Sequence, residues 1–176
     1  MKLADAMDMK GRLTIQKFNC QGKLLTEVKA NNFIVYTGRD LVAKLFLNQK
    51  IDPIKYIAVG TGVDDDKVDP VEYQKLQREV FRKEIKPIDL SKDLTDITKT
   101  VQIDNKDVTQ RNRRVIISAD LDYEEPTPKE NNQPYELREA GLFNASKEGV
   151  MYNRVVFPTL SKTKDFKLTL VWEIIF

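Results

Sequence analysis

The 176-residue sequence predicts a mainly β protein: an antiparallel β-sandwich or barrel-like domain with one or two short α-helices. Apolar and polar side chains alternate over residues 115–124, the period of a strand with one buried face. Residues 166–176 carry a longer alternation, typical of a central core strand. Its large apolar members are Phe166, Leu168, Leu170, Trp172, Ile174 and Phe176.

In the first third of the chain the sequence predicts an arm, a hairpin and a helix. Residues 1–10 show no clear period and are expected to form an N-terminal arm. The runs 12–18 and 23–28 flank a Gly-containing turn and predict a β-hairpin, which we expect Asn31-Asn32 to end. Apolar residues at helical spacing predict a helix over about 37–49, with Thr37 and Asp40 as a variant capping box.

The middle of the chain contains one clear strand and two less regular stretches. Residues 55–59 predict a short buried strand, closed by Gly60-Thr-Gly62. Residues 71–85 fit a helix or a strand equally well. The polar stretch 87–112 predicts a long loop or a weakly paired, protruding β-excursion, where we expect partner contacts.

The last third predicts a strand pair after a proline-containing loop. Residues 124–134 hold three prolines and predict an exposed loop. Residues 135–144 and 150–157 predict two strands that pair, followed by the core strand 166–176. No stretch has the composition of a linker, so we expect residues 11–176 to form a single domain.

Composition removes much of the common catalytic chemistry. The chain has no His and one cysteine, Cys20, which excludes Ser-His-Asp and Cys-His catalysis, His/Cys zinc sites and disulfides within the chain. With 29 Lys and Arg against 27 Asp and Glu, the net charge of +2 predicts no general affinity for nucleic acid. No window resembles a membrane span, so we expect no membrane partner.

Three further patterns suggest chemistry but fit it poorly. Gly60-Thr-Gly62 lacks the remaining residues of a nucleotide-binding loop. The acidic turn 64–69 lacks the spacing of a calcium loop, although a cation there stays a minor alternative. Asp120, Asp122 and Glu124 share the solvent face of one strand, which favours edge protection over acid–base catalysis. We therefore predict no enzyme, no catalytic residue, no cofactor and no metal site.

The candidate site residues are interface residues. Arg111, Arg113 and Arg114 form the only basic concentration and have no aromatic neighbours on which bases could stack, so ion pairing between subunits or at the edge of a strand is favoured. Glu139 and Arg154 are predicted as interface residues, and either one is a candidate for an ion contact across a strand pair.

Several motifs resemble a known group of proteins. They are Lys55-Tyr-Ile-Ala-Val-Gly-Thr-Gly62, Leu76-Gln-Arg-Glu79 with Arg82, Arg138-Glu-Ala-Gly-Leu-Phe-Asn144, Val150-Met-Tyr-Asn-Arg-Val-Val-Phe157, and the terminal run from Asp165 to Phe176. Together they resemble small virion structural proteins of tailed bacteriophages and prophages, of the tail-fibre, baseplate-associated or capsid-associated type. Such proteins also occur in phage-like contractile particles. The resemblance is best over residues 33–62 and 137–176.

The resemblance implies a non-enzymatic building block of a virion or phage-like particle, assembled in the cytoplasm of the bacterial host. Its partners would be neighbouring tail, baseplate or fibre proteins and further copies of itself, since repeated modest interfaces add up in a homo-oligomer. We expect residues 1–10, 87–112 and 124–134 to make the contacts. Two alternatives stay open: a receptor- or glycan-binding adhesion module, which would use Tyr123, Tyr135 and Tyr152, and a capsid decoration (cement) protein.

Overall fold

The computed structural model describes residues 10–47, 49–103 and 106–176, and confirms a mainly β fold with short helices. Within these residues nine strands form one antiparallel sheet in the order β4-β3-β7-β8-β2-β1-β9-β6-β5. The strands are β1 (Lys10–Asn19), β2 (Leu24–Ile34), β3 (Tyr56–Gly60), β4 (Glu79–Glu84), β5 (Leu94–Ile103), β6 (Lys106–Leu121), β7 (Tyr135–Phe143), β8 (Met151–Lys162) and β9 (Phe166–Ile175). The helices are α1 (Tyr36–Phe46) and α2 (Leu90–Asp93), with 3₁₀ turns η1 (Pro70–Glu72) and η2 (Glu130–Asn132).

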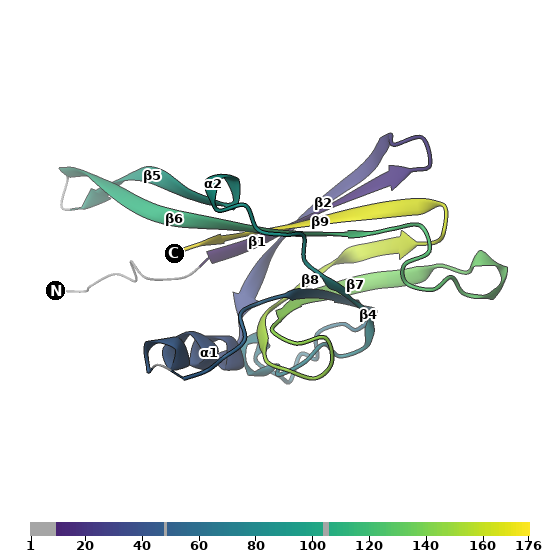
Figure 1. The fold of residues 1–176 in the computed structure, drawn as a ribbon, viewed down its shortest axis with the longest axis horizontal. Coiled ribbons are helices and arrows are strands. Elements are labelled where there is room, and N and C mark those ends of the chain that lie inside the picture. The colour runs from purple at the N-terminus through teal and green to yellow at the C-terminus, as the bar shows by residue number, and fades with distance from the viewer. Residues whose placement is uncertain (1–9, 48, 104–105) are drawn as a thin grey trace.

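The sheet folds over so that its two halves face each other (Figure 1). Strand β2 connects the halves: most of it pairs with β1, while Phe33 and Ile34 at its end pair with β8. On the far side, the Lys86 N–H just beyond β4 donates to the Ser118 carbonyl of β6 at 2.7 Å. The folded sheet therefore encloses one main core, in a barrel-like arrangement.

The core is built from the inward faces of both halves. Strand β9 lies between β1 and β6 and buries Leu168, Leu170, Trp172 and Ile174. These side chains meet Ile57 and other residues of β3, β7 and β8. Each such side chain contributes about 1.5–3 kcal/mol when fully buried, so the alternation read from the sequence accounts for the position of β9.

Strand β9 differs from the sequence prediction at its two ends. Phe166 is only partly buried, and Phe176 lies one residue beyond the strand with 49% of its surface exposed. Both were predicted to be core residues. The alternation sets the face on which a side chain lies, but it does not specify what covers that side chain at the ends of the strand.

Strand β2 continues through Asn31-Asn32, where the sequence predicted a break. Asn32 pairs with Gly11, and its Oδ1 accepts a hydrogen bond from Trp172 Nε1 at 3.1 Å. A Cβ on Gly11 would lie 1.8 Å from that oxygen. Because Gly11 has no side chain, the Asn32 amide has the room to satisfy the buried indole.

Helix α1 forms where expected and ends three residues earlier than the prediction. The predicted capping box is absent: the N-cap is Val35, and it makes no side-chain hydrogen bond. Thr37 Oγ1 instead donates to the Met151 carbonyl of β8 at 2.7 Å, and Asp40 forms an ion pair with Lys44. Thr37 therefore attaches the helix to the sheet rather than capping its first turn.

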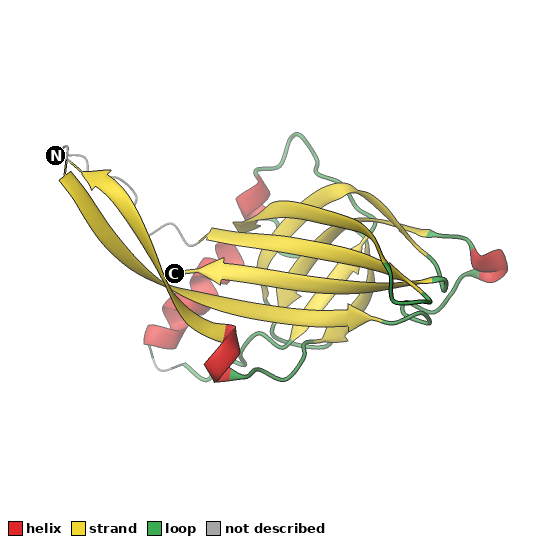
Figure 2. Ribbon diagram, turned by 90° about the horizontal axis from the view of Figure 1, so that it is seen from above, coloured by secondary structure: helices red, strands yellow, loops and turns green. Residues whose placement is uncertain are grey.

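The ambiguous stretch 71–85 contains the end of η1, a loop and strand β4, and the polar stretch 87–112 forms α2 and most of a long β5–β6 hairpin. Strand β6 is 16 residues long: its second half pairs with β9, and its first half continues past the sheet with β5 as its partner. Figure 2 shows this hairpin projecting from the folded sheet. The predicted excursion is thus a regular two-stranded arm. The predicted contact segment 1–10 lies, except for Lys10, outside the described residues.

Candidate functional site

Glu139 and Arg154 form a buried ion pair on neighbouring strands. Glu139 lies on β7 and Arg154 on β8, with 0% and 3% of their side-chain surfaces exposed. Arg154 Nη2 lies 2.9 Å from Glu139 Oε2, and Nε donates to the same oxygen at 3.0 Å. An ion contact across the strand pair is therefore present, and this chain itself covers both side chains. The predicted interface role of these two residues stays a prediction.

The Glu139 carboxylate also accepts three backbone hydrogen bonds from the segment that joins β3 to β4. Oε1 accepts from Gly62 N at 3.1 Å and from Arg78 N at 2.7 Å, and Oε2 accepts from Gln77 N at 3.0 Å. One side chain thereby holds both ends of the connection 61–78. A buried carboxylate with this many donors is well compensated for the loss of water.

The two glycines of Gly60-Thr-Gly62 make room for this carboxylate. A Cβ on Gly62 would lie 2.4 Å from Glu139 Oε1 and 2.4 Å from Gln77 Cβ. A Cβ on Gly60 would lie 2.5 Å from the Arg78 carbonyl oxygen. These glycines therefore permit a close approach, and no phosphate need be invoked to explain them.

The other side of Arg154 faces the acidic turn. Its guanidinium carbon lies 4.1 Å from the centroid of the Tyr73 ring, and Nη1 pairs with Asp64. Asp65 and Asp69 accept backbone hydrogen bonds from Lys67 and Val71 within the turn. Among the described residues no group of three or more acids or cysteines is arranged to hold a metal ion.

A second arginine makes several contacts at the same end of the molecule. Arg82 of β4 pairs with Glu79 at 2.6 Å and lies over the Phe143 ring at 3.7 Å. Its Nη1 donates to the carbonyls of Ala145 and Glu148, both at 2.8 Å. Four of the five motif segments that carry the resemblance to phage proteins therefore meet in one cluster. We call Glu139, Arg154, Tyr73, Arg82, Gly60 and Gly62 the buried ion-pair cluster.

The three arginines of residues 111–114 lie on the β5–β6 hairpin and its base. Arg111 and Arg113 both pair with Asp96 of β5. Arg114 donates to Thr95 Oγ1 at 3.1 Å and lies 3.5 Å from Glu173. One carboxylate thus serves two exposed guanidinium groups, which leaves this part of the hairpin with excess positive charge.

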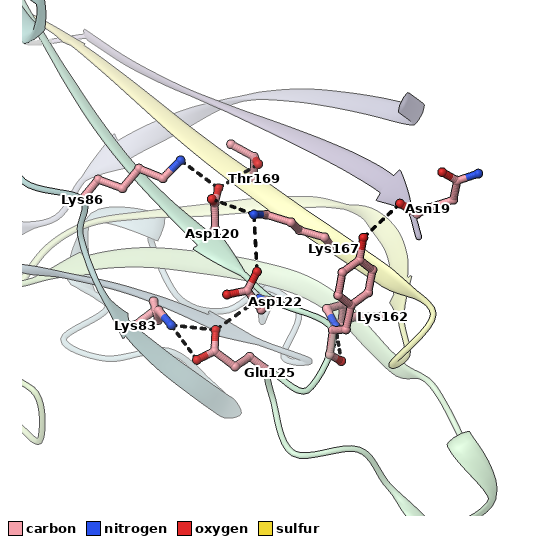
Figure 3. Close-up of polar contacts among 10 residues, drawn as sticks. Asn19, Lys83, Lys86, Asp120, Asp122, Glu125, Lys162, Lys167 and Thr169 are labelled. Atoms are coloured by element: carbon pink, nitrogen blue, oxygen red, sulfur yellow. Dashed lines mark hydrogen bonds and ion pairs between the residues drawn. The ribbon is translucent and has the colours of Figure 1, made fainter. Parts of the chain in front are cut away.

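The acidic residues near the end of β6 belong to a network with lysines (Figure 3). Asp120 lies 3.0 Å from both Lys86 and Lys167 and accepts from Thr169 Oγ1 at 2.8 Å. Partial burial raises the pKa of Asp120, but the hydrogen bonds from these three partners outweigh it and leave the pKa below its usual value. Lys167 also reaches Asp122 at 3.4 Å. Of the three acids predicted to protect a sheet edge, Asp120 and Asp122 are thus balanced by cations.

Lys162 is a buried lysine that sequence reasoning missed. Its side chain is 1% exposed, and Nζ donates to the carbonyls of Tyr123 (3.2 Å) and Thr163 (2.9 Å). Burial lowers the pKa of Lys162 to about 8, against the opposing effect of nearby carboxylates, Glu125 first among them. The available signal was its spacing of two from buried Leu160 on the same strand.

An apolar groove of about 510 Å³ opens between α1 and the ends of β6 and β9. Its lining includes Leu41, Leu45, Phe46, Val115, Ile117 and Phe176. Phe46 is 87% exposed, and the neighbouring Leu47 is 69% exposed. The sequence showed these apolar residues but not that they lie at an open end of the fold.

The three tyrosines considered for glycan binding lie in different surroundings. Tyr152 is buried, and burial raises its pKa to about 12. The Tyr123 hydroxyl donates to the Asn19 carbonyl at 3.1 Å, while Lys129 lies over the Tyr135 ring at 4.3 Å. They do not form one exposed aromatic patch.

Comparison of the chain with protein-family models, with curated proteins and with solved structures found no match. None of the helices among residues 10–47, 49–103 and 106–176 is long and apolar enough to cross a membrane.

Proposed function

We propose that this protein is a non-enzymatic structural component of a bacteriophage virion or phage-like particle. It acts by self-association and by docking to neighbouring tail, baseplate or fibre proteins. The phage assignment depends on the resemblance of the motif segments. Four of these segments meet at the buried ion-pair cluster, which supports a structural role for them within the fold. Glu139 accepts hydrogen bonds from four residues of its own chain.

The observation that carries the docking role is the projecting β5–β6 hairpin. In its distal part, beyond the pair formed by Thr98 and Arg111, β5 and β6 pair with each other, and no third strand of the described residues pairs with either of them there. An isolated two-stranded ribbon is marginally stable in water, so a long one gains most when a partner covers it. The unpaired outer edge of β5 also offers backbone groups to a further strand.

Particle incorporation of a hairpin-shortened chain tests this proposal. Replacing residues 99–110 by Asn-Gly keeps the pairing of Thr98 with Arg111 and removes the distal hairpin. The matched control replaces residues 20–23 by Asn-Gly, which trims the β1–β2 turn at the other end of the long axis (Figure 1). Particles from cells that produce each chain are purified and their proteins identified by mass spectrometry.

We expect the native and control chains in the particles and the hairpin-shortened chain in the soluble fraction only. Absence of the native chain from every particle would overturn the structural role. Equal incorporation of the shortened chain would remove the hairpin as the docking element. Cryo-electron microscopy of the particle then distinguishes a tail or baseplate position from decoration of the capsid.

A further inference from the structure

The apolar groove beside α1 is left open by the way this helix is attached. A Cβ on Gly38 would lie 1.9 Å from the Tyr152 carbonyl oxygen, so the first turn of α1 lies directly on β8. Leu41 is buried, but Leu45 and Phe46 in the last turn are exposed. The second half of the helix therefore overhangs the groove and presents apolar side chains to it.

The beginning of β1 lies at the rim of this groove. Lys10 pairs with Ile175, the last residue of β9. Phe176, which follows Ile175, lines the groove. Phe176 also exchanges two backbone hydrogen bonds with Arg113, at 2.9 and 3.1 Å, so the base of the β5–β6 hairpin lies beside it. Residues 1–9, which precede β1, thus join the described fold next to the exposed apolar surface.

The composition of residues 1–9 matches the groove. The segment has six apolar residues among nine: Met1, Leu3, Ala4, Ala6, Met7 and Met9. Methionine side chains are flexible and polarisable and fill irregular apolar surfaces. A groove lined by aliphatic and aromatic side chains is the kind of surface on which such a segment is stable.

The charges also match. Side chains two residues apart on a strand share a face, so Arg111 and Arg113 continue the face of β6 that carries Val115 and Ile117 of the groove. Among the described residues, Asp96 is the one carboxylate in an ion pair with these two arginines. The segment 1–9 supplies two further carboxylates, Asp5 and Asp8, and one lysine, Lys2, so the complementarity is between Asp5, Asp8 and the arginine pair.

The length of the segment allows it to reach beyond its own chain. Because β1 is antiparallel to β9, β1 begins beside the C-terminal end of β9. Nine residues reach at most about 30 Å when extended. We propose that residues 1–9 of one copy dock in the α1 groove of a second copy, with Asp5 and Asp8 facing Arg111 and Arg113. This inference rests on the self-association proposed above.

A cysteine pair placed on separate chains tests the docking. In a Cys20→Ser background, a chain with Leu3→Cys is mixed with a chain of different mass that carries Leu47→Cys. Leu47 is exposed next to the groove and does not line it, so the substitution leaves the docking surface intact. The matched control carries Val68→Cys, an exposed position on the acidic turn. On oxidation we expect the yield of the mixed disulfide to be at least tenfold higher with Leu47→Cys than with Val68→Cys.

Light scattering of the full chain, of a chain lacking residues 1–9 and of Phe46→Asp separates the possible outcomes. We expect the native chain to associate and both variants to associate at least tenfold more weakly, with their folding checked by Trp172 fluorescence. Undiminished association of both variants would overturn the docking and leave the proposed function standing. A native chain that is monomeric at every concentration would overturn both. A disulfide that closes within one chain carrying both Leu3→Cys and Leu47→Cys, at high dilution, would overturn docking between copies.

Discussion

Removing the charge of Glu139 should destabilise the protein far more than removing another carboxylate of the same strand. Glu139→Ala leaves Arg154 buried without its closest partner, and such a loss costs about 3–5 kcal/mol. The same change removes the acceptor of three backbone N–H groups, each worth about 1–3 kcal/mol when left buried and unsatisfied. Asp64 still pairs with Arg154 and water can enter the space, so we expect a total of about 4 kcal/mol.

A milder variant keeps this prediction measurable if Glu139→Ala does not fold. Glu139→Gln retains one oxygen for the backbone donors but removes the charge, which predicts a loss of about 2 kcal/mol and a fall in Tm of about 4–8 °C. The control is Glu136→Gln, also on β7, whose carboxylate accepts only from the Ser161 hydroxyl among the hydrogen bonds described for it. We expect its effect to stay within about 0.5 kcal/mol.

Urea unfolding followed by the fluorescence of Trp172 provides the assay. Trp172 is the only tryptophan and is fully buried in the main core, so its emission reports global unfolding. Equal midpoints for Glu139→Gln and Glu136→Gln would refute the assignment of Glu139 as the residue that holds the β3–β4 connection. A change in slope rather than midpoint would instead indicate a loosened native state.

Three further predictions concern other parts of the fold. Gly62→Ala should lower the free energy of unfolding by about 1–3 kcal/mol, because its Cβ would lie 2.4 Å from Glu139 Oε1; a neutral effect in urea titration would contradict the close approach. Lys162 has a folded-state pKa of about 8 against 10.5 ordinarily, so the unfolded chain binds more protons between these values and stability should rise with pH there. Thermal unfolding should show that the stability of the native chain increases relative to that of Lys162→Met as the pH rises across this interval. A relative decrease in stability would contradict the prediction. Replacing residues 99–110 by Asn-Gly should leave Tm within about 3 °C, since no third strand of the described residues pairs with the distal hairpin; a cooperative loss of the core fluorescence would show that the hairpin supports the sheet.

The strands with a strict alternation could be predicted from the sequence. In β9 the apolar residues at Leu168, Leu170, Trp172 and Ile174 recur every second position, and the structure buries all four. The helix over 36–46 was predicted by its apolar spacing. These elements depend on contacts close in sequence and on a single buried face, which is information that the local pattern carries.

Elements with a long-range cause were predicted less well. Asn31-Asn32 reads as a turn, but Asn32 stays in β2 because Trp172, 140 residues later, donates to it across Gly11. Thr37 reads as a helix cap, but the Met151 carbonyl takes its hydrogen bond. In both cases a partner distant in sequence outweighed the local preference.

The sequence by itself determined the antiparallel β class, the helix and the place of the protruding segment, because period and turn residues act between near neighbours. Only the tertiary structure decided that Glu139 pairs with Arg154, that this pair is buried and that the glycines 60 and 62 make room for it. It also decided that the apolar end of α1 faces open space beside Phe176. Burial depends on what the folding of the sheet brings over a side chain, and no local pattern specifies that covering.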